Sequence, residues 1–322
     1  MLKYVLKRIL MLIPVILGIV FLVFFIMDLA PGDPVYQIVS ENATDEEIAA
    51  VRAEYGLDKP LLVRYGNYVV NMVRGDLGRS YITQQDVLSL YMEKFPATLM
   101  LALAAIFVAV VISLPLGIYA SVKQNTWQDG VCMIFSLLGL SIPNFWLGLL
   151  LIILFALTLG WLPASGMRSF SSIILPAITE GTGLAAFITR TTRSSMLETI
   201  RADYVTTARA KGVTRKDSVL KHAFRNALIP IITASGMQFA YVMAGCVLTE
   251  TVFAWPGVGR QLVAAINDRD VPTVTGFLVL TAIVTCLINL IMDIVYAYVD
   301  PRVKVQYAAQ NARKRKKAEV GK

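Results

Sequence analysis

The chain has 322 residues, of which 56% are hydrophobic and only 16% are charged. This composition excludes an ordinary soluble protein and predicts a polytopic membrane protein, because each spanning helix requires about 20 mostly apolar residues. The formal net charge of +8 gathers in the N-terminus, one loop and the tail, so membrane topology explains it without a nucleic-acid partner.

The sequence lacks the residue patterns typical of metal binding, redox chemistry and ATP hydrolysis. The three cysteines lie in apolar segments without CxxC or metal-ligand spacing, and there is a single histidine, His222. No GxxxxGK[ST] phosphate loop is present, so the chain cannot bind and hydrolyse ATP in that manner. We therefore predict no catalytic residue, no cofactor and no metal in this chain.

The first apolar run, residues 9–27, follows Lys3, Lys7 and Arg8. It is longer than the apolar core of a signal peptide, and no A-x-A cleavage site follows it. Residues 1–29 are therefore predicted to form a cytoplasmic N-terminus and an uncleaved first transmembrane helix.

Residues 30–96 form a long polar region after this helix. Ten acidic residues outnumber six basic ones here, which predicts an external location. Thr44 with Glu47 predicts a helix start with a capping box, and apolar residues between 62 and 72 predict a second, amphipathic helix.

Residues 97–299 are predicted to form a core of five further spanning helices, beginning with 97–120. The next apolar run, 131–159, is too long for one simple span and is interrupted at Pro143 and Asn144. This interruption is either a proline kink stabilised by packing or irregular backbone that lines a cavity, where such backbone is tolerated.

The fourth predicted span, 173–188, contains Glu180. An ionisable side chain is costly at membrane depth. Glu180 is therefore predicted either to line a cavity, or to reach the outer interface or pair within the helix bundle.

The loop 190–226 carries nine Lys or Arg residues against three acidic ones, which predicts a cytoplasmic location. A stretch without a helix breaker precedes Gly212, which is predicted to end that helix in a left-handed conformation. Thr214 and Asp217 then predict the start of a second short helix with one apolar stripe, ending before Pro230. The loop is either a solvated topology signal or a pair of short helices that docks on a soluble partner.

The fifth and sixth predicted spans are 227–248 and 274–299. Between them, ETVFAWPGVG begins at Glu250 and by itself predicts only a glycine and proline turn with an aromatic anchor. The sixth span carries Asp293, for which we expect pairing with a basic neighbour. Residues 300–322 contain eight Lys or Arg residues and predict a cytoplasmic, disordered tail that contacts lipid.

The basic loop resembles the EAA loop of ABC importer permeases, in the form typical of their dipeptide/oligopeptide branch. That branch favours TARAKG followed by HAxRNALxP, and this chain has TARAKG at 207–212 and HAFRNALIP at 222–230. The Glu of the general EAA core is absent, since Thr206, Thr207 and Ala208 occupy those places. The stretches GLDKPLLVRYGNYVVNMVRGDLGRSY and ETVFAWPGVG also resemble family segments, and the resemblance covers most of residues 1–305.

The resemblance implies an all-α polytopic membrane protein with six transmembrane helices and the type I, MetI-like permease fold. It implies a subunit that translocates di- or oligopeptides across the bacterial inner membrane, with both termini cytoplasmic. The implied partners are a second homologous permease, two ABC ATPase subunits that hold ATP and Mg, and an external peptide-binding protein.

The resemblance also implies site residues. The ATPase subunits dock on the 201–226 loop, at Thr206, Thr207, Ala208, Arg209, Ala210, Lys211, Gly212, Val219, Leu220, His222, Phe224 and Arg225. The candidates for the translocation path are Pro143, Asn144, Glu180 and Glu250.

Two alternatives stay open. The same fold can import a nickel complex, glutathione or an oligosaccharide, because cargo choice lies largely in the binding protein. An ion-coupled carrier or an integral-membrane enzyme predicts paired intramembrane carboxylates, histidines or an inverted repeat. Glu180 and Asp293 are instead isolated in the sequence, and no inverted repeat is visible.

Overall fold

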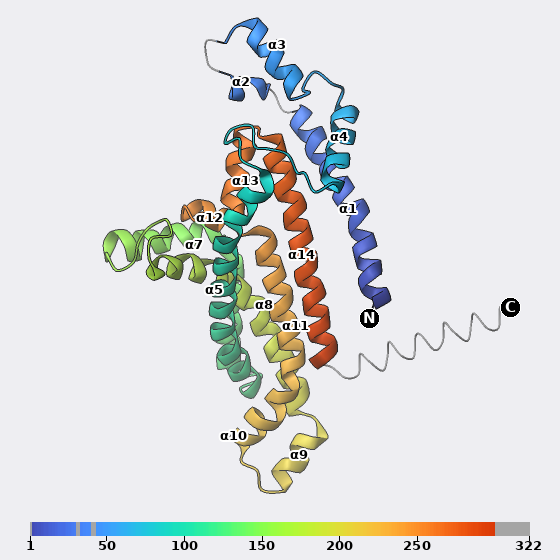
Figure 1. Cartoon of the computed structure of the whole chain (residues 1–322). Helices are drawn as coiled ribbons and strands as arrows, with labels where there is room; N and C mark the ends of the chain where they lie inside the picture. The colour runs from blue at the N-terminus through green and yellow to red at the C-terminus, as the bar shows by residue number, and fades with distance from the viewer. Residues whose placement is uncertain (1, 30–32, 40–42, 300–322) are drawn as a thin grey trace, which may run out of the picture. The chain divides into compact units, whose positions relative to one another are not determined.

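A computed structural model describes residues 2–29, 33–39 and 43–299 (Figure 1). This described part is all-α, as predicted, apart from one isolated bridge between Arg79 and Asp86. The predicted lipid-facing tail lies outside the described residues.

The chain divides into two compact units. The first unit holds the described residues of Met1–Ala104, Asn144–Thr179 and Tyr241–Cys286. The second unit holds those of Ala105–Pro143, Glu180–Ala240 and Leu287–Lys322. Four long helices contribute residues to both units: α5 (Val87–Val122), α8 (Ile174–Ile200), α11 (Phe224–Gly245) and α14 (Val271–Val299).

In the first unit, the N-terminal helix α1 (Leu2–Leu29) is followed by three short helices. These are α2 (Val35–Ile38), α3 (Asp45–Glu54) and α4 (Leu61–Val73). The capping box predicted for α3 is confirmed, because Glu47 N donates to Thr44 Oγ1 over 3.3 Å and Thr44 N donates to Glu47 Oε2 over 2.8 Å.

The predicted amphipathic helix is also confirmed, as α4. It lies alongside α1 (Figure 1), where Tyr65 and Tyr68 pack against the buried Val20 and Phe24. This apolar seam holds α4 against α1 through close side-chain packing, in which many small dispersion contacts add up.

A buried carboxylate ties the loop after α4 to the start of α14. Ser80 Oγ donates to Asp270 Oδ2 over 2.5 Å, and Tyr81 N donates to Asp270 Oδ1 over 3.1 Å. Thr273 Oγ1 also donates to Asp270 Oδ2, over 2.7 Å. Burial, and then the nearby Asp270 carboxylate, raise the pKa of Tyr81 to about 12, so this phenol is neutral at physiological pH.

Within the described residues, four continuous helical stretches have the length and apolar character of a membrane span. They are Val87–Val122, Phe170–Ile200, Arg215–Gly245 and Val271–Met292. A broken pair of helices adds a fifth if it is counted as one span, and the shorter apolar stretch Ile13–Leu29 belongs to α1. This is compatible with the predicted six helices.

The interruption predicted at Pro143 is confirmed. Helix α6 (Trp127–Ser141) ends there, and α7 (Asn144–Leu151) and the π-helix η1 (Ile152–Thr158) follow. Ile142 is extended, with ψ of 122°. Proline disfavours the α conformation in the residue before it, which explains why the helix breaks at this point.

Besides the 3₁₀-helix η2 (Phe170–Ile173), the first unit holds two further α-helices, α12 (Val247–Val252) and α13 (Val258–Asn267). They contain or flank the ETVFAWPGVG stretch. The two helices contact each other, and α12 also contacts α7.

Candidate functional site

The first half of the predicted coupling loop folds as expected. Helix α9 (Asp203–Ala210) ends at Gly212, whose φ of +90° confirms the predicted left-handed conformation. Gly212 N donates to Arg209 O over 3.0 Å, and Val213 N donates to Ala208 O over 3.2 Å. These two bonds satisfy the last carbonyl groups of α9, as is usual where a glycine ends a helix.

The second half differs from the prediction. Thr214 caps the next helix, since Asp217 N donates to Thr214 Oγ1 over 3.1 Å. However, α10 (Arg215–Asp217) and the π-helix η3 (Ser218–Ala223) run directly into α11. The prediction of a separate second short helix that ends before Pro230 was therefore wrong.

A single helix from Arg215 to Gly245 explains this difference. Pro230 lies inside α11, and prolines are tolerated in spanning helices when the freed backbone groups find other partners. The charges of Lys221 and Arg225 resemble those of a loop, but they sit on the first turns of the span. The surface of the loop is consequently joined to the span without a flexible linker.

The packing of this region leaves most of the predicted coupling residues exposed. Val205 of α9 and Val219 and Ala223 of η3 are buried, and α9 contacts η3. Phe224 and Ala208 are half-buried. The exposed residues are Thr206, Thr207, Arg209, Ala210, Lys211, Gly212, Leu220, His222 and Arg225.

This exposed set forms a basic surface at the end of the α8 and α11 helices, where Figure 1 shows α9 and α10. Its buried residues fix the two halves against each other, so the surface is a folded platform and not a solvated strand of chain. A platform with cations around apolar residues suits docking to an acidic protein surface.

An ion pair that sequence reasoning missed joins α8 to α6 in the second unit. Arg193 of α8 donates to both carboxylate oxygens of Asp129 at the start of α6, with Nε 2.7 Å from Oδ1 and Nη2 2.6 Å from Oδ2. The Asp129 carboxylate also accepts from Asn125 N over 3.1 Å, and its side chain is 7% exposed. Asp129 is the one acidic residue of the stretch 121–129 that was predicted as a short loop, which was the available signal.

Helices α5 and α8 also approach each other closely in the second unit. A Cβ atom on Gly117 would lie 2.6 Å from Thr192 Cβ and 2.9 Å from Thr189 O. A glycine at such a contact lets two spanning helices meet through backbone, which is how small residues stabilise helix pairs in a bilayer.

Glu250, a predicted path residue, has a fully buried side chain with several polar partners. Thr98 Oγ1 donates to Glu250 Oε1 over 2.6 Å, and Arg260 N donates to Oε2 over 2.9 Å. Arg260 lies in the first turn of α13, so the carboxylate accepts from the free N–H groups of a helix N-terminus. The geometry indicates that Glu250 fixes the turn between α12 and α13.

Two glycines make room for this carboxylate. A Cβ on Gly257 would lie 2.2 Å from Glu250 Oε1, and one on Gly259 would lie 2.8 Å from Val247 Cα. Trp255 Nε1 donates to Ala97 O over 2.8 Å, which attaches the same turn to α5. The PGVG part of the stretch is thus required by close packing around Glu250.

The four predicted path residues do not gather in one described unit. Asn144 begins α7 in the first unit, which also contains Glu250, and α7 packs on α12 with Gly148 close to Phe253. Pro143 and the buried Glu180 belong to the second unit. The side chain of Asp293 lies outside the described residues. A path formed by these residues remains a prediction.

The described residues contain no group of three or more His, Cys, Asp or Glu side chains arranged to hold a metal ion.

Comparison with protein families gives two matches. Residues 113–305 match the family described as "Binding-protein-dependent transport system inner membrane component". Residues 1–102 match the family of N-terminal regions of such membrane components.

Two curated proteins show similarity over nearly the whole chain. The glutathione transport system permease protein GsiC of Escherichia coli (strain K12) is 40% identical over 304 residues, covering 94% of this chain and 99% of that protein. The dipeptide transport system permease protein DppB of Alkalihalophilus pseudofirmus is 39% identical over 332 residues, covering 94% of this chain and 100% of that protein.

A solved structure supports the fold. The MetNI methionine ABC transporter in an inward-facing conformation has a chain that matches with a TM-score of 0.56 and 22% identity. The match covers 66% of this chain and 96% of the other. At this level of identity the match establishes a shared fold only.

Proposed function

The chain belongs to the family of binding-protein-dependent transport system inner membrane components, and we propose that it imports short peptides across the bacterial inner membrane. The observation that carries the proposal is the similarity, over 94% of the chain, to permeases named for dipeptide and glutathione transport. Glutathione is itself a small γ-linked peptide, so both names indicate peptide-like cargo.

The proposed energy source is a pair of partner ATPase subunits that dock on the α9–η3 platform. ATP and Mg belong to these partners, and this chain supplies no cofactor site and no catalysis. The exposed cations Arg209, Lys211 and Arg225 support docking to an acidic groove. The other proposed partners are a second homologous permease and an external peptide-binding protein.

The proposed mechanism is alternating access, in which movements of the ATPase subunits act on this chain at the platform. The helix from Arg215 to Gly245 is continuous, so no flexible linker separates η3 from α11. A displacement of η3 therefore moves α11 directly. The Asp129–Arg193 pair holds α8 and α6 together in the same unit as the platform. ATP drives the cycle only if the ATPase binds it better in one conformation than in the other.

The proposed topology has both termini and the platform in the cytoplasm. The nine cations of the 190–226 loop support this orientation, since Lys and Arg accumulate on the cytoplasmic side of spanning helices. The acidic segment between α1 and α5 then lies outside, where a binding protein delivers cargo.

A pull-down of the tagged full chain from detergent tests the assembly. We expect recovery of ATPase subunits and of a second permease with similar spans. A chain that purifies alone, stable and without ATPase, would instead support an ion-coupled carrier or a membrane enzyme.

Glutathione is the second candidate cargo. The relative named for glutathione transport is as similar to this chain as the relative named for dipeptide transport. Competition separates the two: unlabelled dipeptide or glutathione is added to cells that take up a labelled dipeptide through this system. Inhibition by dipeptides alone supports the first cargo, and equal inhibition by glutathione supports the second.

A further inference from the structure

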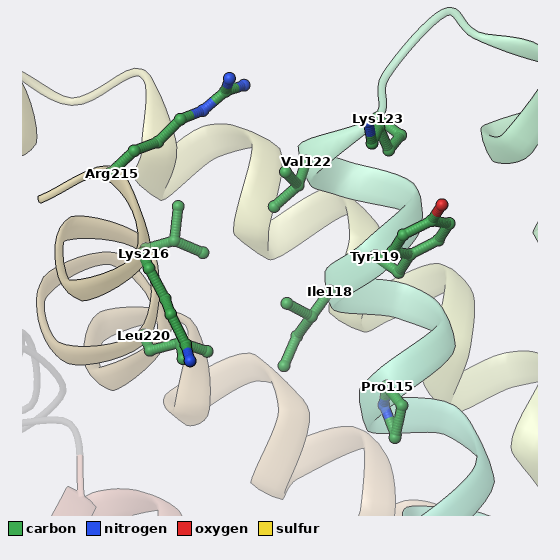
Figure 2. Close-up of a pocket in the computed structure, with 9 residues that line it drawn as sticks. Pro115, Ile118, Tyr119, Val122, Lys123, Arg215, Lys216 and Leu220 are labelled. Carbon is green, nitrogen blue, oxygen red and sulfur yellow. The ribbon is translucent and has the colours of Figure 1, made fainter.

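A groove in the second unit lies between the last turns of α5 and the first turns of the Arg215–Gly245 helix (Figure 2). Its volume is about 610 Å³, within the range of small-ligand sites. The residues that line it are Pro115, Ile118, Tyr119, Val122, Lys123, Arg215, Lys216, Val219 and Leu220.

The groove lies at the level where the apolar run of α5 ends and the polar first turns of the Arg215–Gly245 helix begin. Val122 is the last residue of the span in α5, and Lys123 follows it directly. Arg215 is the first residue of the other span. Residues at the ends of spanning helices lie at the boundary between hydrocarbon and headgroups, whichever side of the membrane this end faces.

The walls of the groove are largely apolar, Lys123 and Arg215 lie toward one end of it, and the Lys216 side chain runs along the facing helix toward Leu220 (Figure 2). In Figure 2, Ile118 and Val122 project from α5 toward the helix that carries Leu220, and Arg215 extends toward the end of the groove where Lys123 lies. Lys123, Arg215 and Lys216 are exposed. Apolar walls with cations toward one end match a molecule with a hydrocarbon body and an anionic head.

The charges of the groove are not neutralised by the described residues that line it, because none of these is acidic. The nearest acid along the chain, Asp217, pairs with Lys221 over 2.9 Å on the same helix. Asp129, which begins α6 after Lys123, is bound by Arg193. Lys123 and Arg215 are therefore available to an anionic ligand at this end of the groove, and Lys216 lies along its wall.

We propose that this groove binds one anionic phospholipid, with its phosphate against Lys123 and Arg215, an acyl chain along Ile118, Val122 and Leu220, and Lys216 as a further cation on the groove wall. Basic pockets between spanning helices bind anionic headgroups in this way. The apolar walls favour lipid over an acidic peptide, since a peptide backbone requires hydrogen-bond partners that these walls do not supply.

This site has a consequence for the platform, since Leu220 belongs to η3 and Lys216 lies one turn before it, and η3 packs against α9. A bound lipid would fix the start of this helix at the headgroup level. The inference does not require a particular cargo, so it can fail while the proposed transport function holds.

The test uses the full chain in nanodiscs with equal amounts of phosphatidylglycerol and phosphatidylcholine, and native mass spectrometry to identify retained lipid. We expect wild type to retain phosphatidylglycerol selectively. The variant K123Q/R215Q/K216Q should lose this preference by on the order of a hundredfold, about fivefold for each cation removed. The control R209Q/K211Q/R225Q removes the same charge outside the groove and should retain it.

A second variant, Val122→Trp, fills the apolar part of the groove and leaves the three cations in place. We expect it to lose phosphatidylglycerol as well, which separates a lipid site from a site for free phosphate. Size-exclusion chromatography checks that each variant is folded. If Val122→Trp does not fold, the comparison of K123Q/R215Q/K216Q with its control still tests the proposal, because those substitutions replace exposed side chains.

Three results would overturn the proposal. The first is equal retention of phosphatidylcholine and phosphatidylglycerol by wild type. The second is retention of phosphatidylglycerol by K123Q/R215Q/K216Q. The third is a combined result: K123Q/R215Q/K216Q no longer binds ATPase subunits, and added ATPase displaces the lipid from wild type. That result would assign the groove to the interface with the ATPase.

Discussion

Arg193 binds Asp129 through two parallel hydrogen bonds that join α8 to the start of α6. The Asp129 carboxylate is buried, while Arg193 is 25% exposed at its side chain. The two residues are 64 positions apart in the chain, so this pair closes a long loop in the second unit. Its geometry is the bidentate form that makes Arg–carboxylate contacts strong and directional.

Removal of the carboxylate by Asp129→Asn should destabilise the chain by about 2 kcal/mol, because Arg193 then keeps its charge in a largely buried place without an anion. The apparent melting temperature in detergent measures this. Lys221→Gln, which breaks the exposed pair with Asp217, is the control and should change the melting temperature little. Equal effects of the two changes would contradict the structural role of the buried pair.

Gly212 and Gly75 provide a matched pair for the coupling hypothesis. Their φ values are +90° and +89°, and neither has an atom within 4 Å of the place where a Cβ would lie. Substitution of either by Asp costs similar backbone strain, about 1–2 kcal/mol. Only Gly212 lies on the proposed docking surface.

We expect Gly212→Asp to insert normally but to uncouple transport from ATP hydrolysis, because it adds an acid to the docking surface. Gly75→Asp should keep uptake coupled. Peptide uptake and ATPase activity, measured together in proteoliposomes, test this. Normal uptake and normal ATPase recovery with Gly212→Asp would rule out the docking role of this turn.

Gly257 tests the role of Glu250 in the α12–α13 turn. A methyl group at this position would meet the Glu250 carboxylate, which hydrogen bonds to Thr98 and to the backbone of Arg260 hold in place. We expect Gly257→Ala to cost about 1–3 kcal/mol through overpacking. Gly245→Ala, in open space, is the control and should leave the melting temperature unchanged.

Tyr81 predicts a specific loss of stability at high pH. Its pKa in the folded chain is raised to about 12 from an ordinary value of 10.0, so the unfolded chain loses this proton first. The contribution of Tyr81 is complete below pH 10 and declines as the pH rises toward 12. Compared with wild type, Tyr81→Phe should show a shallower decline between these values in melting experiments, and parallel curves would contradict this assignment.

Features that depend on neighbouring residues were predictable from the sequence. Thr44 and Glu47 form the expected capping box, Gly212 has the expected left-handed conformation, and the helix breaks at Pro143. In each case the controlling interaction lies within a few residues, so the local sequence determines it.

Features that depend on distant residues were not predictable in the same way. Glu250 finds Thr98 at a separation of 152 residues, and no local pattern indicates that contact. The span beginning at Arg215 was also placed too late, because its basic first turns have the charge pattern of a loop. Its packing against α9 compensates for that polar character, and the packing is a property of the fold.

The most direct test of the coupling account is photo-crosslinking in intact membranes from the exposed position Thr207 of α9. A photoreactive amino acid there should crosslink to an ATPase subunit. The same group at Val73, an exposed residue at the end of α4, should not. A crosslink from Thr207 to an external binding protein, or an ATPase crosslink from Val73 alone, would contradict both the docking surface and the proposed topology.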